Sequence, residues 1–146
     1  MIPTIVLTDK PDHQLRTAID TLLGQFNEER SSHAAVSRPL ALILSLPGSN
    51  EVAGGLWGTT GWNDLHIELL FVPQRMRGSG LGRELLGCAE NEAILLGCGH
   101  VRLDSFSFQA RGFYGRLGYA AFGELGNYPH NHKRFFMTKT LGLNGS

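Results

Sequence analysis

The apolar positions of the chain follow two spacings, which predict a protein built from both helices and strands. Near the N-terminus they recur every three or four residues, at Leu15, Ile19, Leu22, Leu23 and Phe26. This spacing predicts a helix with one buried face that starts after the Pro and Asp signals of residues 9–12 and ends near Phe26. A short strand is expected before it, over residues 4–8, and a polar loop or second short helix after it, over residues 27–39.

Further along, short apolar runs bounded by turn-forming residues predict strands, and two segments with helical spacing separate them. The strands are expected over residues 40–46, 51–60, 65–72, 100–106, 119–125 and 134–140. The helices are expected over residues 80–96, with Gly97 as the C-terminal cap, and over residues 110–117. This order predicts one mixed α/β domain over residues 1–146, with a central mixed β-sheet of six to seven strands flanked by helices.

Strict alternation along residues 65–72 divides that strand into an apolar face and a mixed face. The apolar face holds Leu65, Ile67, Leu69 and Phe71, and we expect it to meet the core. The mixed face holds His66, Glu68, Leu70 and Val72. The two ionisable side chains should therefore point away from the core.

The strand leads into a glycine-rich loop that opens directly into a helix, with glycines at 78, 80 and 82. Glycine lets the backbone approach a ligand closely, and the first N–H groups of a helix lack helical partners. Arg75, Arg77 and Arg83 add positive charge, so the loop predicts a phosphate or pyrophosphate site. A Rossmann fingerprint fails because Arg83 or Leu85 stands where its last glycine is needed, and no Gly-Lys-Ser/Thr triplet of a Walker A loop exists.

Two motifs resemble the GNAT superfamily of acetyltransferases. The run Arg-Gly-Ser-Gly-Leu-Gly at residues 77–82 is similar to its Arg/Gln-x-x-Gly-x-Gly/Ala cofactor motif. The run Phe-Tyr-Gly-Arg-Leu-Gly-Tyr at residues 113–119 is similar to its aromatic-Tyr signature. Both occur in order within residues 65–120, and the resemblance implies the GNAT acyl-CoA N-acyltransferase fold with acetyl-CoA as co-substrate and no metal.

The resemblance also implies which residues hold acetyl-CoA. Backbone groups of Leu70, Phe71 and Val72 would pair with the pantetheine arm, and one N–H, that of Leu70, would stabilise the oxyanion. Backbone N–H groups of the loop would hold the pyrophosphate, from Arg77, Gly78, Ser79, Gly80, Leu81, Gly82 and Arg83. Ser107 stands where many relatives carry an asparagine that contacts the pantetheine.

Two catalytic roles follow from the same resemblance. Tyr114 is the candidate general acid that protonates the departing thiolate, although its position on a helical face also suits a core aromatic. An acceptor amine arrives protonated and must lose a proton before it attacks. Glu68 is the candidate base, with His66 or a water chain to solvent as alternatives.

The composition of the chain argues against several classes of binding partner. Thirteen Lys and Arg balance thirteen Asp and Glu, which argues against a nucleic-acid partner. No apolar run approaches the ~18 residues that cross a bilayer. Cys88 and Cys98 have no CxxC spacing and suit reduced thiols in the cytoplasm, while His130 and His132 lack the neighbours of a metal site.

These observations predict an N-acetyltransferase that moves an acetyl group from acetyl-CoA to a primary amine in a ternary complex. Neutral charge and compact length favour a small-molecule amine. The alternatives are acetylation of a protein N-terminus or lysine, and a non-catalytic acyl-CoA-binding module. The run at residues 128–136 resembles a subset of small bacterial members, but this chain has Asn131 where that subset usually has a glycine. A homodimer is compatible with the resemblance.

Overall fold

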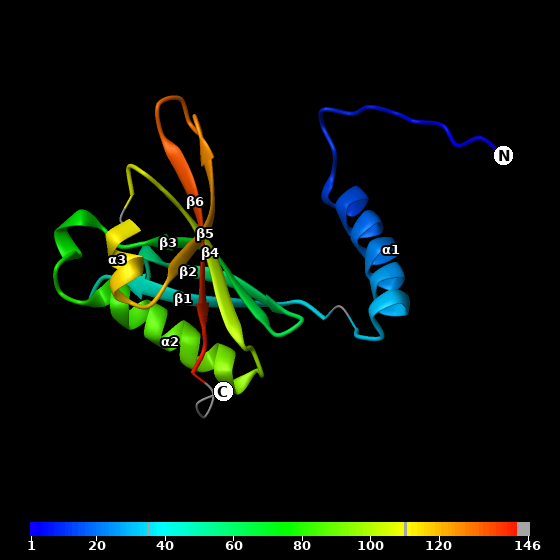
Figure 1. Ribbon diagram of the computed structural model, residues 1–146. Coiled ribbons are helices and arrows are strands. Elements are labelled where there is room, and N and C mark those ends of the chain that lie inside the picture. Colours follow the sequence, from blue (N-terminus) through cyan, green and yellow to red (C-terminus); the bar gives the residue numbers. More distant parts are fainter. Residues whose placement is uncertain (35, 110, 143–146) are drawn as a thin grey trace. The chain divides into compact units, whose positions relative to one another are not determined.

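The computed structural model of the protein describes residues 1–34, 36–109 and 111–142 (Figure 1). Its contacts form two compact units, Met1–Ala35 and Val36–Ser146. The single domain over residues 1–146 therefore stays a prediction, and residues 110 and 143–146, which it includes, lie outside the described part.

The first unit contains one helix, α1 (His13–Ser31). Asp12 caps its start, because a side-chain oxygen of Asp12 accepts the N–H of Leu15 at 3.1 Å. The helix continues past Phe26 until Ser32 adopts a left-handed conformation, with φ 62°. The expected end near Phe26 is therefore wrong, and residues 27–31, expected in a loop or a second short helix, belong to the same helix.

One further expectation for this unit is wrong, because residues 4–8 form no strand. Among its described residues, the unit itself holds no second helix or strand that could cover the apolar stripe of α1, so the buried face of this helix stays a prediction.

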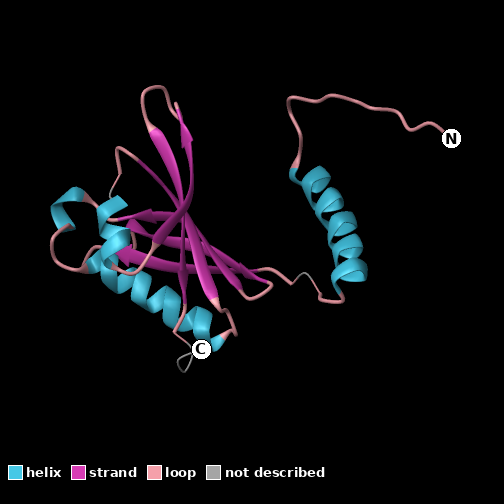
Figure 2. Ribbon diagram, in the orientation of Figure 1, coloured by secondary structure: helices cyan, strands magenta, loops and turns pink. Residues whose placement is uncertain are grey.

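The second unit is built on a six-stranded mixed sheet, which confirms the predicted fold class (Figure 2). Its strands are β1 (Arg38–Ser45), β2 (Val52–Gly61), β3 (Asp64–Phe71), β4 (His100–Phe106), β5 (Ala120–Gly126) and β6 (Lys133–Thr140). They lie in the order β1-β2-β3-β4-β6-β5, and only β3 and β4 run parallel. The helical segments are η1 (Gln74–Met76), α2 (Leu81–Leu95) and α3 (Arg111–Arg116).

The hydrophobic core lies between one face of the sheet and α2. Leu86, Ala89 and Ala93 of α2 pack with the fully buried Leu65 and Val101 of the two parallel strands. Apolar side chains of α3 pack against the same cluster, so both helices cover one face (Figure 1). The opposite face carries the polar residues of β3 and β4.

β3 and β4 are joined over only part of their length. The register pairs run from Asp64–His100 to Ile67–Leu103, and beyond them β3 continues on β2 while β4 continues on β6. The carboxyl ends of the two parallel strands therefore separate and leave facing backbone edges without ladder partners.

A β-bulge lies where the strands separate. Ile67 pairs with Gly58 and Leu69 with Trp57, which leaves Glu68 without a partner on β2. The extra residue reverses the alternation: Leu70 packs against the core, while Leu69 is 67% and Phe71 55% exposed. The expected faces are thus correct up to Ile67 and wrong for these three residues.

Candidate active site

The loop between β3 and α2 is held in shape by its own side chains. The Nε of Arg77 donates to the carbonyl of Val72 at 2.8 Å, and the Ser79 hydroxyl donates to the carbonyl of Met76 at 2.7 Å. Gly78 and Gly80 adopt φ 83° and 87°, which glycine tolerates best. Nothing lies within 4 Å of where a Cβ would stand at either glycine, so the backbone is open to an approaching group.

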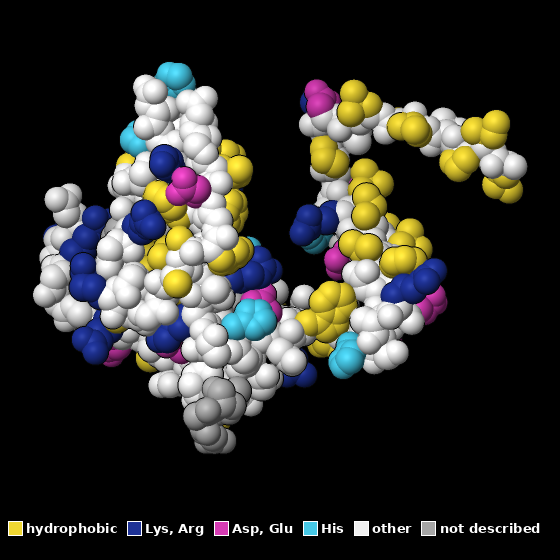
Figure 3. Space-filling model, in the orientation of Figure 1, with side chains coloured by type: hydrophobic (Ala, Val, Ile, Leu, Met, Phe, Trp, Pro, Cys, Tyr) yellow, Lys and Arg dark blue, Asp and Glu magenta, His cyan; other side chains and the backbone are white. Residues whose placement is uncertain are grey.

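The N-terminus of α2 completes this anion-binding geometry. The first helical bond runs from the Glu84 N–H to the Gly80 carbonyl, so the N–H groups of Leu81, Gly82 and Arg83 have no helical acceptor. Basic side chains gather over this part of the molecule (Figure 3), where the loop carries exposed arginines. The helix dipole and these charges suit a pyrophosphate, so the loop fits the predicted role of residues 77–83.

The open edge of β3 lies next to this loop. Leu70 and Phe71 pair with Leu56 and Gly55 of β2 on one side, and on the other side β4 has already diverged. An extended chain with amide groups, such as pantetheine, fits such an edge as an added strand would. Val72 ends the segment, and its carbonyl already accepts the Arg77 side chain.

Tyr114 is positioned by contacts between aromatic rings. Its ring packs edge-to-face against Phe113 at 5.2 Å and Tyr119 at 5.9 Å between centroids. Burial raises the pKa of the Tyr114 phenol, so the hydroxyl is protonated at neutral pH. No hydrogen bond engages that hydroxyl among the described residues, which leaves its proton available to a ligand.

Gly82 connects α3 to the glycine loop. A Cβ at this position would lie 3.1 Å from the Phe113 ring, so the third glycine makes room for the aromatic residue beside Tyr114. The two sequence motifs therefore meet in space.

The Ser107 hydroxyl already takes part in hydrogen bonds within the protein, which limits the bonds that it can form with a ligand. Its hydroxyl oxygen accepts the Lys133 N–H at 2.9 Å and lies 3.2 Å from Nδ1 of His132. When Nδ1 is unprotonated, the hydroxyl proton is donated to it, and Ser107 can then only accept a hydrogen bond from another partner. The pantetheine contact of Ser107 stays a prediction that depends on the tautomer of His132.

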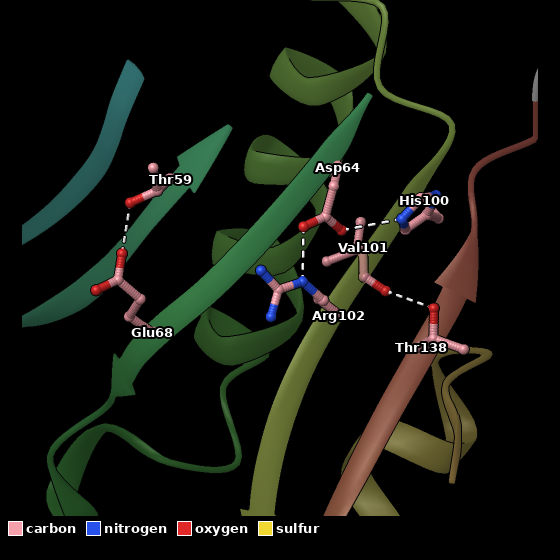
Figure 4. Close-up of polar contacts among 7 residues, drawn as sticks. All are labelled: Thr59, Asp64, Glu68, His100, Val101, Arg102 and Thr138. Atoms are coloured by element: carbon pink, nitrogen blue, oxygen red, sulfur yellow. Dashed lines mark hydrogen bonds and ion pairs between the residues drawn. The ribbon is translucent and has the colours of Figure 1, made fainter. Parts of the chain in front are cut away.

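The ionisable residues of β3 lie on the face opposite α2. Glu68 points from the bulge toward β2, where the Thr59 hydroxyl donates to its Oε2 (Figure 4). His66 pairs with Thr59 in the β2 register and with Arg102 in the β4 register. Glu68 is thus oriented by a neighbouring strand, while no side-chain hydrogen bond orients His66 in the part of the chain that is described.

Sequence reasoning did not single out two residues of this face. Thr59 orients Glu68, and the alternation of residues 51–60 could have placed it there. Asp104 is the next residue after the last β3–β4 pair and forms an ion pair with Arg134. The alternation His100, Arg102, Asp104 was the available signal.

A hollow of about 350 Å³ lies on the β2 side of the end of β3. Its lining comes from the β1–β2 hairpin and from the start of the glycine loop, and includes Glu51, Val52, Phe71 and Arg75. It therefore lies beside the candidate cofactor segment rather than between β3 and β4.

The described residues hold no group of three or more His, Cys, Asp or Glu that could bind a metal ion. Within the same residues, no helix combines the length and apolar character needed to span a membrane.

Comparisons with known proteins agree with this geometry. The profile of the acetyltransferase (GNAT) family matches residues 10–119. The chain is 39% identical to the blasticidin-S acetyltransferase of Streptomyces morookaense over 131 residues, which is 88% of this chain and 96% of that protein.

Solved structures extend the likeness to three dimensions. An acetyltransferase of Bacillus cereus superimposes with a TM-score of 0.79 at 29% identity, over 93% of this chain and 98% of that one. A Bacillus anthracis structure in complex with acetyl coenzyme A shares the fold, with a TM-score of 0.61 at 20% identity over 70% and 62% of the two chains. With its glycine loop at a helix start and its parted parallel strands, the protein belongs to the GNAT acetyltransferase family and is an acetyl-CoA-dependent acetyltransferase.

Proposed function

We propose that the protein transfers the acetyl group of acetyl-CoA to the primary amine of a small molecule, by direct transfer in a ternary complex. The observation that carries the proposal is the opening between β3 and β4, which has the glycine loop at one end and polar side chains on its outer face. The likeness to blasticidin-S acetyltransferase supports a small-molecule acceptor. When bound, acetyl-CoA supplies an activated thioester and a thiolate leaving group.

Different residues of the chain bind acetyl-CoA, stabilise the developing charge and donate a proton. The loop at residues 77–83 binds the pyrophosphate through its N–H groups, and Leu70, Phe71 and Val72 bind the pantetheine through the edge of β3. The N–H of Leu70 stabilises the negative charge that develops on the carbonyl oxygen. Tyr114 donates its proton to sulfur as the thiolate departs, because its hydroxyl is protonated and free.

Glu68 accepts the proton that the acceptor amine must lose. The bulge presents its carboxylate on the outer face, and the Thr59 hydroxyl occupies one oxygen, so the other oxygen can approach an amine. His66 on the same strand and a water chain remain the alternatives. Substitution of each residue in turn separates them.

The proposal is tested by measuring CoA release with a panel of acceptors: blasticidin S, streptothricin, spermidine and a lysine-containing peptide. We expect turnover with at least one small amine and none with the peptide. A thermal-shift titration with acetyl-CoA runs in parallel, where a hundredfold excess over Kd adds about 2.7 kcal/mol to the stability.

Each outcome has a distinct meaning. Turnover with the peptide alone would make a protein the acceptor. A thermal shift with acetyl-CoA and no turnover with any amine would favour a non-catalytic acyl-CoA-binding module.

We further propose that the enzyme acts in the cytoplasm. Cys88 is an exposed free thiol and Cys98 a buried one, which suits a reducing compartment. A homodimer is part of the same proposal and is tested by light scattering of the purified protein.

A further inference from the structure

The paired segment of the two parallel strands ends just before a carboxylate on each strand. The last pairs of β3 and β4 are His66–Arg102 and Ile67–Leu103, and the next residues along each strand are Glu68 and Asp104. Both lie where the strands begin to separate. They stand on the two sides of the opening that the reaction requires.

Both side chains belong to the same face of the sheet. Asp64 of β3 contacts His100 and Arg102 of β4 on the face opposite α2, as Figure 4 shows. Asp104 follows two residues after Arg102, so alternation returns it to that face, and its half-buried ion pair with Arg134 lies there. Glu68 is on this face as well, bonded to Thr59.

Asp104 is a fixed carboxylate with one oxygen uncommitted. Arg134 bonds its Oδ2, while no bond among the described residues engages Oδ1. The other arm of the guanidinium bonds the Tyr128 hydroxyl at 2.9 Å, and rings surround it, with centroids of Phe106 and Phe136 both at 5.4 Å. The guanidinium is itself held by these contacts, so it fixes the orientation of the Asp104 carboxylate.

Resting on the proposed function, we propose that Asp104 is the acceptor-binding residue of the enzyme. Its free oxygen accepts an N–H from the acceptor's ammonium group at the opening, on the same face of the sheet as Glu68. One ammonium proton then passes to the Glu68 carboxylate and on to solvent, and the nitrogen lone pair that remains forms the new bond to the acetyl carbon. The carbon–sulfur bond breaks as Tyr114 protonates the departing thiolate, and the second proton that the nitrogen loses restores the Tyr114 phenol. The preferred substrates are alkylamines that are cationic at neutral pH, rather than arylamines that are uncharged.

The chain offers a matched control. Asp64 is also a carboxylate on this face with an arginine partner, Arg102 at 2.7 Å, but it lies at the opposite end of the paired segment. Asp64→Asn and Asp104→Asn therefore each remove one negative charge from a carboxylate–arginine pair on this face, and only the second lies at the opening.

The experiment measures binding of blasticidin S and spermidine to protein saturated with CoA, by calorimetry, so that no turnover is needed. We expect Asp104→Asn to raise the Kd of the amine about tenfold to a hundredfold, the range for a hydrogen bond to a charged group. Asp64→Asn should stay within twofold of wild type, Asp104→Glu should recover part of the affinity, and the thermal shift with acetyl-CoA should be unchanged in all three.

The inference is overturned if Asp104→Asn binds both amines as wild type does, or if Asp64→Asn weakens them equally. It is also overturned if neither amine binds the CoA-saturated wild-type protein. If Asp104→Asn does not fold, wild-type KM values decide: a cationic hexylamine should have a KM at least tenfold below that of uncharged aniline, and equal values would overturn the inference. Failure of the proposed function appears differently, as amine binding without acetyl transfer.

Discussion

Tyr114 and Tyr119 have rings in contact, yet their hydroxyls have different surroundings. Tyr119 donates to Glu90 at 2.8 Å, and Lys139 bonds the other oxygen of that carboxylate at 2.8 Å. Tyr114 has no such partner among the described residues. One phenol is therefore built into the fold, while the other is free to act on a ligand.

The first prediction compares the two tyrosines. Tyr114→Phe should lower kcat by about 100-fold because the departing thiolate loses its proton donor. Tyr119→Phe should leave kcat near wild type and lower the free energy of unfolding by about 1–3 kcal/mol, because Glu90 loses a hydrogen bond. Steady-state kinetics and urea unfolding of both variants check this, and equal kcat values would remove Tyr114 from the mechanism.

The second prediction concerns Glu68. Glu68→Gln keeps the length of the side chain and its bond to Thr59 but removes the basic carboxylate, so kcat at saturating amine should fall by about 100-fold or more. His66→Gln should leave kcat within a fewfold of wild type. The reverse ranking would make His66 the base, and two active variants would favour a water chain.

At the scale of elements, Gly82 and Gly87 form a matched pair on α2. Gly87→Ala meets nothing within 4 Å and should stabilise the protein by about 1 kcal/mol through helix propensity. Gly82→Ala should lose that gain because its Cβ would push the Phe113 ring, and with it Tyr114. We expect kcat/KM for acetyl-CoA to fall about tenfold in Gly82→Ala alone, since small misplacements of catalytic groups are costly; equal effects would contradict the contact.

The sequence predicted the elements far better than the faces of one of them. Periodicity located α2 and β4 within a residue or two, because each buries a regular stripe on the core. Alternation could not show the bulge at Glu68, since a bulge depends on how β2 and β3 pair rather than on composition. The face of Leu70 was therefore mispredicted although its strand was correct.

The site residues that belong to a sequence motif were predicted, whereas those that depend on strand pairing were not. The glycine loop was visible because three glycines in five residues are unusual at a helix start, and Tyr114 because residues 113–119 resemble a family signature. Thr59 and Asp104 were not singled out, since an isolated Thr or Asp on a strand carries no local signal and acquires meaning only through the register of β2, β3 and β4.

At the scale of the whole molecule, two buried phenols should make the free energy of unfolding decrease as the pH rises into the alkaline range. Burial raises the pKa of Tyr114, and burial with the Glu90 carboxylate raises that of Tyr119. Their contribution is complete below the unfolded value of about 10 and is lost above it, because the unfolded chain then releases protons that the folded chain retains.

Urea unfolding between pH 8 and pH 11 tests this dependence. Each raised phenol contributes a slope of about 1.4 kcal/mol per pH unit above pH 10, so Tyr119→Phe should have a shallower decline than wild type. Parallel declines of the two proteins would show that Tyr119 does not carry the effect.

Because β3 and β4 separate, the rate of amide hydrogen exchange along the edge of β3 should show whether acetyl-CoA or CoA is bound. Only four register pairs join the three-stranded halves of the sheet, and the amides on the free edge of β3 have no ladder acceptor. In the empty enzyme these amide hydrogens should exchange with deuterium as fast as those of an exposed loop, and pantetheine should slow them. Deuterium uptake by residues 68–72 would then measure loading with acetyl-CoA or CoA before any acceptor amine is known.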